Sequence, residues 1–139
     1  MASIHTDTLI DARPQDVWAA LRDWGRPHEV LVPGFVTATE LDGADRIVTF
    51  ADGSVARELF VDCDEERRRL VWAIVGGAMT HHNGVAQVLE EPDGRTRFVW
   101  TADILPHELA DQIGPMMALG ASVVKKTLEA QAASQATVA

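Results

Sequence analysis

The stretch PHELADQIGPMMALGASVVKKTLEA, residues 106–130, decides the fold because it reads as one long amphipathic helix. Its apolar and small residues recur at spacings of three and four, which places them on the single stripe that a surface helix turns toward a core. A helix of this length spans roughly 35 Å, the width of a small domain. Gly114 and Pro115 interrupt the pattern, so we expect a kink or a restart there. The stripe consists of Leu109, Ile113, Met116, Met117, Gly120, Val123, Val124 and Leu128.

The chain before this helix reads mainly as strands. Residues 3–11 alternate between two sets of side chains, which is typical of a strand. Two short helices are expected over residues 14–24 and 28–32, and Pro14 suits the first turn of the earlier one. The Asp-Gly pairs that separate several later segments are strong hairpin signals. Six further strands are expected over residues 35–41, 46–51, 55–63, 69–75, 80–91 and 96–105.

This order of elements predicts an α+β fold. Strands that follow one another, with helices set apart from them, favour an antiparallel sheet over a wound parallel one. A sheet of about seven strands is wide enough to curl strongly, so we expect it to wrap around the long helix and to leave a cavity between them. The chain reads as one domain over residues 1–130, followed by a disordered tail at residues 131–139.

The composition is typical of a soluble cytoplasmic domain. The 139 residues are 47% hydrophobic, and the formal net charge of −9 argues against nucleic acid and anionic membranes as partners. The one cysteine, Cys63, excludes an internal disulfide and a cysteine-based zinc site. The N-terminus does not read as a signal peptide, and no apolar run approaches the ~20 residues of a membrane span. Because the chain has no tyrosine, a phenol cannot serve as an acid or a base.

Three local strings carry a family resemblance. They are IDARPQDVWAALRDW at residues 10–24, VARELFVDCDEERRRLVWAIV at residues 55–75 and GRTRFVWTADILP at residues 94–106. With the order of elements, they make nearly the whole chain resemble the START-related or SRPBCC superfamily, which includes polyketide cyclases/dehydrases, lipid-transfer domains and birch-pollen-allergen-like proteins. The resemblance implies a helix-grip fold. It implies no single activity, because the superfamily shares a cavity and not a catalytic signature.

Hairpin geometry predicts which side chains face that cavity. The apolar phase of the last strand turns Phe98 and Trp100 inward. A hairpin closed at Asp93-Gly94 then pairs Leu89 with Phe98 and Gln87 with Trp100, and closing the two earlier hairpins in the same way turns further residues inward. A single bulge would flip every assignment beyond it. The closure at Asp64 to Arg67 pairs Val61 with Leu70. The inward residues of the three preceding strands are then Val55, Arg57, Leu59, Val61, Leu70, Trp72, Ile74, His81, Asn83, Val85, Gln87 and Leu89.

The predicted cavity is mainly apolar, with a few polar groups that converge on it. This combination is typical of a small-molecule site. Trp72 and Trp100 offer flat stacking surfaces, Met116 and Met117 supply adaptable walls, and Gly120 allows a close approach to the helix backbone. The candidate ligand-binding residues are Trp72, Asn83, Gln87, Trp100, Phe98, Met116, Met117 and Gly120.

Three residues are candidates for catalysis. Arg57 would hold a carbonyl oxygen as enolate charge develops, and His81 would transfer the proton. His28 lies in a segment that would cover one mouth of the cavity, where it could act as a gate or a base. Each has a structural alternative: Arg57 paired with a cross-strand carboxylate, His81 bonded to solvent or backbone, and His28 in a solvated loop. Adjacent strand residues such as His81 and His82 point to opposite faces and cannot share one ion, so we expect neither a metal nor a cofactor.

Three functions remain open from the sequence. The first is the binding of a hydrophobic small molecule, aromatic or polyketide-like, in the cavity. The second is an enzyme of the cyclase/dehydrase kind that uses Arg57 and His81 and the shape of the pocket. The third is a protein-interaction module without a small ligand. The chain is expected to be a monomer or a homodimer, since a first strand at the sheet edge could pair with another chain but its polar alternation does not demand this.

Overall fold

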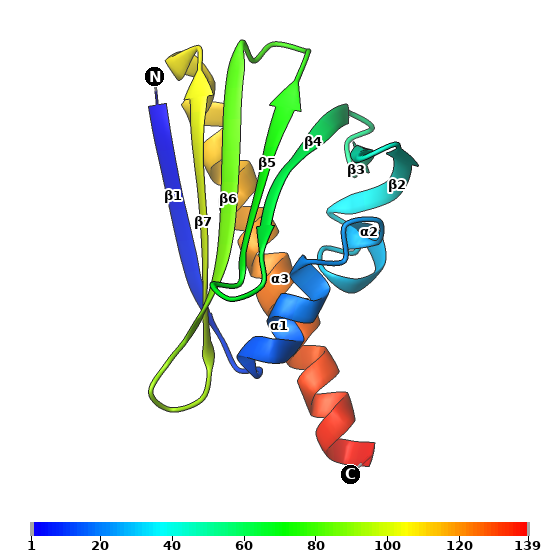
Figure 1. Cartoon of the computed structure of the whole chain (residues 1–139), viewed down its shortest axis with the longest axis vertical. Coiled ribbons are helices and arrows are strands. Elements are labelled where there is room, and N and C mark those ends of the chain that lie inside the picture. The colour runs from blue at the N-terminus through cyan, green and yellow to red at the C-terminus, as the bar shows by residue number, and fades with distance from the viewer. Residues whose placement is uncertain (1, 139) are drawn as a thin grey trace.

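One antiparallel sheet of seven strands curls around a long C-terminal helix in the computed structural model, which describes residues 2–138 (Figure 1). The strand order is β1-β7-β6-β5-β4-β3-β2, so the first strand pairs with the last and the others form a meander. This architecture confirms the predicted helix-grip fold. The strands are β1 (Ala2–Ile10), β2 (Val36–Asp42), β3 (Asp45–Phe50), β4 (Val55–Asp64), β5 (Arg69–Val75), β6 (His81–Glu90) and β7 (Thr96–Leu105).

The helices lie at the two ends of the sequence, as predicted. Two short helices, α1 (Pro14–Leu21) and α2 (Pro27–Val30), follow β1, and each has a proline in its first turn. A 3-10 turn, η1 (His107–Leu109), leads into the long helix α3 (Ala110–Val138).

Two expectations for the long helix differ from the structure. No restart occurs at Gly114-Pro115, because Pro115 lies close to the start of α3 and its missing N–H removes only one hydrogen bond there. The helix also continues through Val138, where the sequence predicted a disordered tail from residue 131; residue 139 lies outside the described residues.

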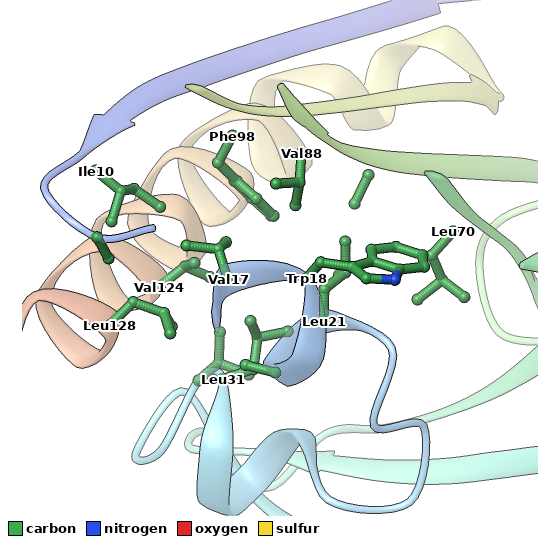
Figure 2. Close-up of a cluster of buried hydrophobic side chains, with 14 of the residues drawn as sticks. Ile10, Val17, Trp18, Leu21, Leu31, Leu70, Val88, Phe98, Val124 and Leu128 are labelled. Carbon is green, nitrogen blue, oxygen red and sulfur yellow. The ribbon is translucent and has the colours of Figure 1, made fainter. Parts of the chain in front are cut away.

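The apolar core closes one end of the space between sheet and helix. Figure 2 shows Val124 and Leu128 of α3 facing Val17 of α1 and Phe98 of β7, and all four are buried. Full burial of each such side chain contributes about 1.5–3 kcal/mol to folding. This part of the fold therefore anchors α1 and α3 to the sheet.

The register of β6 against β7 is one residue away from the predicted one. Val88, and not Leu89, lies opposite Phe98. The turn contains three residues between Glu91 and Arg95 and not two: Gly94 N–H donates to the Glu91 carbonyl at 2.9 Å, with Gly94 at a φ of 89°. Because a shift of one residue exchanges the faces of a strand, the prediction for β6 is wrong throughout. The inner face of β6 carries His82, Gly84, Ala86 and Val88, and the outer face carries His81, Asn83, Val85, Gln87 and Leu89.

The faces of β4 are also exchanged relative to the prediction. The sequence paired Val61 with Leu70, whereas Cys63 lies opposite Leu70 and an irregularity falls between Phe60 and Asp62. Arg57 therefore lies on the outer face, while Glu58 lies buried on the inner one. The predicted inner face of β5 is correct, because the one-residue errors in the β6–β7 and β5–β6 pairings cancel. Its inner residues are Leu70, Trp72 and Ile74.

Gly120 sets how closely α3 approaches the sheet. A Cβ at this position would lie 2.9 Å from Cζ3 of Trp100 and 3.3 Å from the ring of Phe35. Gly114, in the same helix, has nothing within 4 Å of the equivalent point. A substitution at Gly120 therefore tests both packing against the sheet and helix propensity, whereas one at Gly114 tests helix propensity without that packing.

We expect Gly120→Ala to destabilise the protein by about 1–3 kcal/mol, because the added methyl group overpacks a rigid indole. Gly114→Ala is the control. Its gain in helix propensity is offset by the restriction that Pro115 imposes on the preceding residue, so the change stays below about 1 kcal/mol. Urea unfolding followed by circular dichroism measures both variants, and equal stabilities would contradict the role given to Gly120.

Candidate functional site

A cavity of about 360 Å³ lies between the inner face of the sheet and α3. Its wall is mainly apolar, and its exposed residues come from the β3–β4 turn, the β5–β6 loop and the first turns of α3. The cavity therefore opens at the end of the sheet away from α1. Its inner part is lined by Leu21, Leu31, Leu70, Ala86, Phe98 and Val124.

Two indole rings face each other across this cavity wall. Trp72 of β5 and Trp100 of β7 have ring centroids 6.2 Å apart with a tilt of 45°. The strand between them leaves room for the rings, since a Cβ on Gly84 would lie 2.8 Å from Cε2 of Trp72 and 3.0 Å from Cε1 of His82. The inner face of β6 must therefore carry a small residue at position 84 if the Trp72 ring is to keep its place in the cavity wall.

A buried ion pair forms the polar part of the wall. Arg46 and Glu58 lie opposite each other on β3 and β4, with 2.7 Å between Nε and Oε1. Arg46 Nη1 also donates to the carbonyl oxygen of Trp24 at 3.1 Å, and the guanidinium lies 3.8 Å from the centroid of the Trp24 ring. Both charged side chains are more than nine-tenths buried and line the cavity. This pair was not among the predicted site residues, although opposite charges facing each other across the Asp52-Gly53 hairpin were a usable signal.

His82 is the second polar feature. The pairing of β5 with β6 ends at Trp72 and Gly84, and beyond this point His82 Nδ1 accepts the N–H of Ile74 at 3.0 Å. Burial disfavours the charged ring and, with the nearby His81, lowers the pKa of His82 from 6.5 to about 4. The ring is therefore neutral at pH 7, and with Nδ1 accepting, its proton lies on Nε2.

The structure brings most of the predicted ligand-binding residues together. Trp72, Phe98 and Trp100 line the cavity from the sheet, and Met116 and Met117 line it from α3. Gly120 does not line the cavity but lies behind Trp100 and Phe35.

Four predicted residues lie away from the cavity because of the two register errors. Arg57 is part-exposed on the outer face, bonded to Asp42 at 2.8 Å and to Asp45 at 2.9 Å, and these carboxylates raise its pKa. His81 is exposed, and Asn83 lies on the outer face opposite Asp103. Gln87 donates to the carbonyl oxygen of Arg67 at 3.2 Å.

His28 also lies outside the cavity lining. Its Nδ1 is 3.0 Å from Oγ1 of Thr39, and its Nε2 is 3.4 Å from the carboxylate of Glu29. The contact with Thr39 holds α2 to β2, so His28 is a part-buried helix residue and neither a cavity residue nor the solvated loop residue of the alternative.

Within residues 2–138, no group of three or more His, Cys, Asp or Glu side chains is arranged to hold a metal ion. The described helices also include none that is both long and apolar enough to cross a membrane.

Comparison with known proteins agrees with this architecture. A family model described as polyketide cyclase / dehydrase and lipid transport matches residues 1–139. No curated protein matches the sequence significantly.

Several solved structures share the fold. An uncharacterized protein from Bacillus thuringiensis has a TM-score of 0.81 at 15% identity and covers 91% of this chain and 98% of its own. A protein from Thermobifida fusca has a TM-score of 0.75 at 27% identity, with coverages of 90% and 91%. Truncated norcoclaurine synthase from Thalictrum flavum has a TM-score of 0.66 at 19% identity, with coverages of 92% and 94%.

The low pKa of His82 predicts a specific loss of stability in acid. Between pH 6.5 and about 4, the unfolded chain protonates this ring while the folded chain does not, so stability falls as the pH falls. The fall amounts to at most about 3 kcal/mol and levels off below pH 4. In His82→Asn, Oδ1 replaces Nδ1 as the acceptor for Ile74, and this contribution disappears. Urea unfolding of the wild-type protein and of His82→Asn from pH 7.5 to 4 measures the contribution of His82 to stability. Parallel pH profiles of the free energy of unfolding would contradict the low pKa of His82.

The two arginines are expected to differ in their effect on stability. Arg46→Ala leaves the Glu58 carboxylate buried without its partner, which costs about 3 kcal/mol. Arg57→Ala removes ion pairs on the outer face only, so we expect little change. Chemical unfolding at pH 7.5 compares the two variants. Equal losses would show that the Arg46 pair is not the buried element of the wall.

Proposed function

The chain belongs to the polyketide cyclase/dehydrase and lipid transport family, and from this membership we propose that it binds a hydrophobic small molecule in the cavity between the sheet and α3. The observation that carries the proposal is the cavity of about 360 Å³ with two indoles in a mainly apolar wall. Small-molecule sites have this size range and this combination of apolar surface with a few polar groups. An aromatic or polyketide-like compound fits the flat faces of Trp72 and Trp100 best.

A cyclase-like enzyme is the second candidate function. Because Arg57 and His81 lie outside the cavity, the polar residues of the cavity wall would have to carry out the reaction of such an enzyme. His82 Nε2–H would stabilise a developing enolate oxygen, and the Glu58 carboxylate would accept a proton. We rank this function second because Arg46 already engages that carboxylate at 2.7 Å.

A protein-interaction module is the third candidate and has the least support, because such a protein needs no open cavity. The formal charge of −9 continues to argue against nucleic acid and anionic membranes as partners. We propose a cytoplasmic monomer or homodimer that takes its ligand from solution.

A cavity-filling variant tests the proposed function. Ile74 lines the cavity near its mouth, and Ile74→Trp should occupy part of its volume. We expect the wild-type protein to bind the uncharged fluorescent probe 1-aminoanthracene with a dissociation constant on the order of micromolar. Ile74→Trp should weaken binding at least tenfold.

The control is Val85→Trp, which places the same side chain on the outer face of β6. Circular dichroism verifies that both variants are folded. Equal affinities for the two variants, or no binding of the probe to the wild-type protein, would refute binding in this cavity.

A further inference from the structure

Two hydrogen-bond donors in the cavity wall have no acceptor within the described part of the chain. The His82 residue is more than nine-tenths buried, and the hydrogen bond that fixes its ring uses Nδ1, which leaves Nε2–H facing no acceptor of the described residues. Trp100 Nε1 is fully buried and likewise has no partner among residues 2–138. A fully buried donor such as Trp100 Nε1 costs free energy until an acceptor reaches it, whereas His82 Nε2 does not meet that level of burial.

The orientation of His82 is fixed by its surroundings. The bond from Ile74 N–H holds Nδ1 at 3.0 Å, and Gly84 leaves the space that the ring occupies. The neutral tautomer with its proton on Nε2 is thus imposed by the backbone of β5. A donor held in this way is present before any ligand enters.

Among residues 2–138, no unpaired positive charge lines the cavity. Its charged lining residues are Arg46, Glu58 and Asp52. Arg46 and Glu58 neutralise each other at 2.7 Å, and Asp52 is an exposed carboxylate at the mouth. A carboxylate ligand would lose its hydration without gaining a cation, which makes its burial costly.

We propose that the cavity selects uncharged compounds that carry a carbonyl oxygen on an apolar, ring-containing body, and that His82 donates through Nε2 to this oxygen. The inference rests on the proposed binding function and adds the chemical class of the ligand. A carbonyl oxygen suits this wall because it only accepts hydrogen bonds. Trp100 Nε1 is the second donor, but it is covered in the absence of ligand.

Three naphthalene probes of similar size test the proposal. They are 2-acetonaphthone, its hydrocarbon isostere 2-isopropenylnaphthalene, and 2-naphthoate, which is ionised at pH 7.5. Equilibrium dialysis gives their dissociation constants for the wild-type protein, His82→Asn, His81→Asn and Trp100→Phe. His81 is the matched control, since it is the neighbouring histidine on the opposite face.

We expect His82→Asn to weaken binding of the ketone about fivefold while leaving the affinity for the hydrocarbon unchanged. The unchanged hydrocarbon affinity would also show that the variant keeps its cavity. His81→Asn should change neither constant, and 2-naphthoate should bind the wild-type protein at least tenfold more weakly than the ketone does.

The remaining outcomes count against the proposal. A ketone affinity that falls in Trp100→Phe but not in His82→Asn would reject His82 as the donor. Equal affinities for 2-naphthoate and the ketone would reject selection for uncharged ligands. If the hydrocarbon binds but the ketone is not affected by His82→Asn, the proposed function survives and this inference fails. If no probe binds the wild-type protein, both fail.

Discussion

A single helix is too narrow to fill the concave face of a seven-stranded sheet, and the cavity follows from this constraint. Strands spaced about 4.8 Å apart give the sheet a width of roughly 30 Å, whereas a helix with its side chains is about 10–12 Å across. The helix α3 makes its main sheet contacts with β1 and β7. The helices α1 and α2 close one end of the remaining space, and the concave surface of β3 to β6 is left to line the cavity (Figure 1).

The polar groups of the wall are few and lie among apolar neighbours. The inner face of β3 carries both the apolar Val48 and the charged Arg46. The ion pair with Glu58 makes that burial tolerable, and the ring of Trp24 covers the guanidinium. The burial of His82 is tolerable for a different reason, because its environment keeps the ring neutral. The wall is therefore polar in places and has little net charge.

The sequence predicted the fold well because its signals are redundant over long segments. The apolar stripe of α3 involves many residues and the Asp-Gly turn signal occurs several times, so no single residue decides the prediction. The limits of β5 and β7 were predicted to the residue. The phase of β7 was also clear, because Phe98 and Trp100 are bulky and lie on one face.

The candidate site was harder to predict because it depends on single residues in turns. The three-residue turn at Gly94 and the irregularity near Phe60 each shift the pairing by one, which exchanged Glu58 for Arg57 and His82 for His81. The pattern of β6 could not reveal the error. Its inner face carries the small residues Gly84 and Ala86, so that Trp72 has room, while the larger Val85 and Leu89 lie outside.

The early end of the β5–β6 pairing has a kinetic consequence. Beyond Trp72 and Gly84 the two strands are joined through the His82 ring and not through further strand pairing, so this rim of the sheet separates when one side-chain hydrogen bond breaks. Local opening of this kind requires far less free energy than global unfolding. The amide of Ile74 should therefore exchange its hydrogen with solvent on the timescale of this opening, while the amides around Phe98 report the unfolding of the whole domain. Hydrogen exchange thus distinguishes the rim of the cavity from the core that closes its other end.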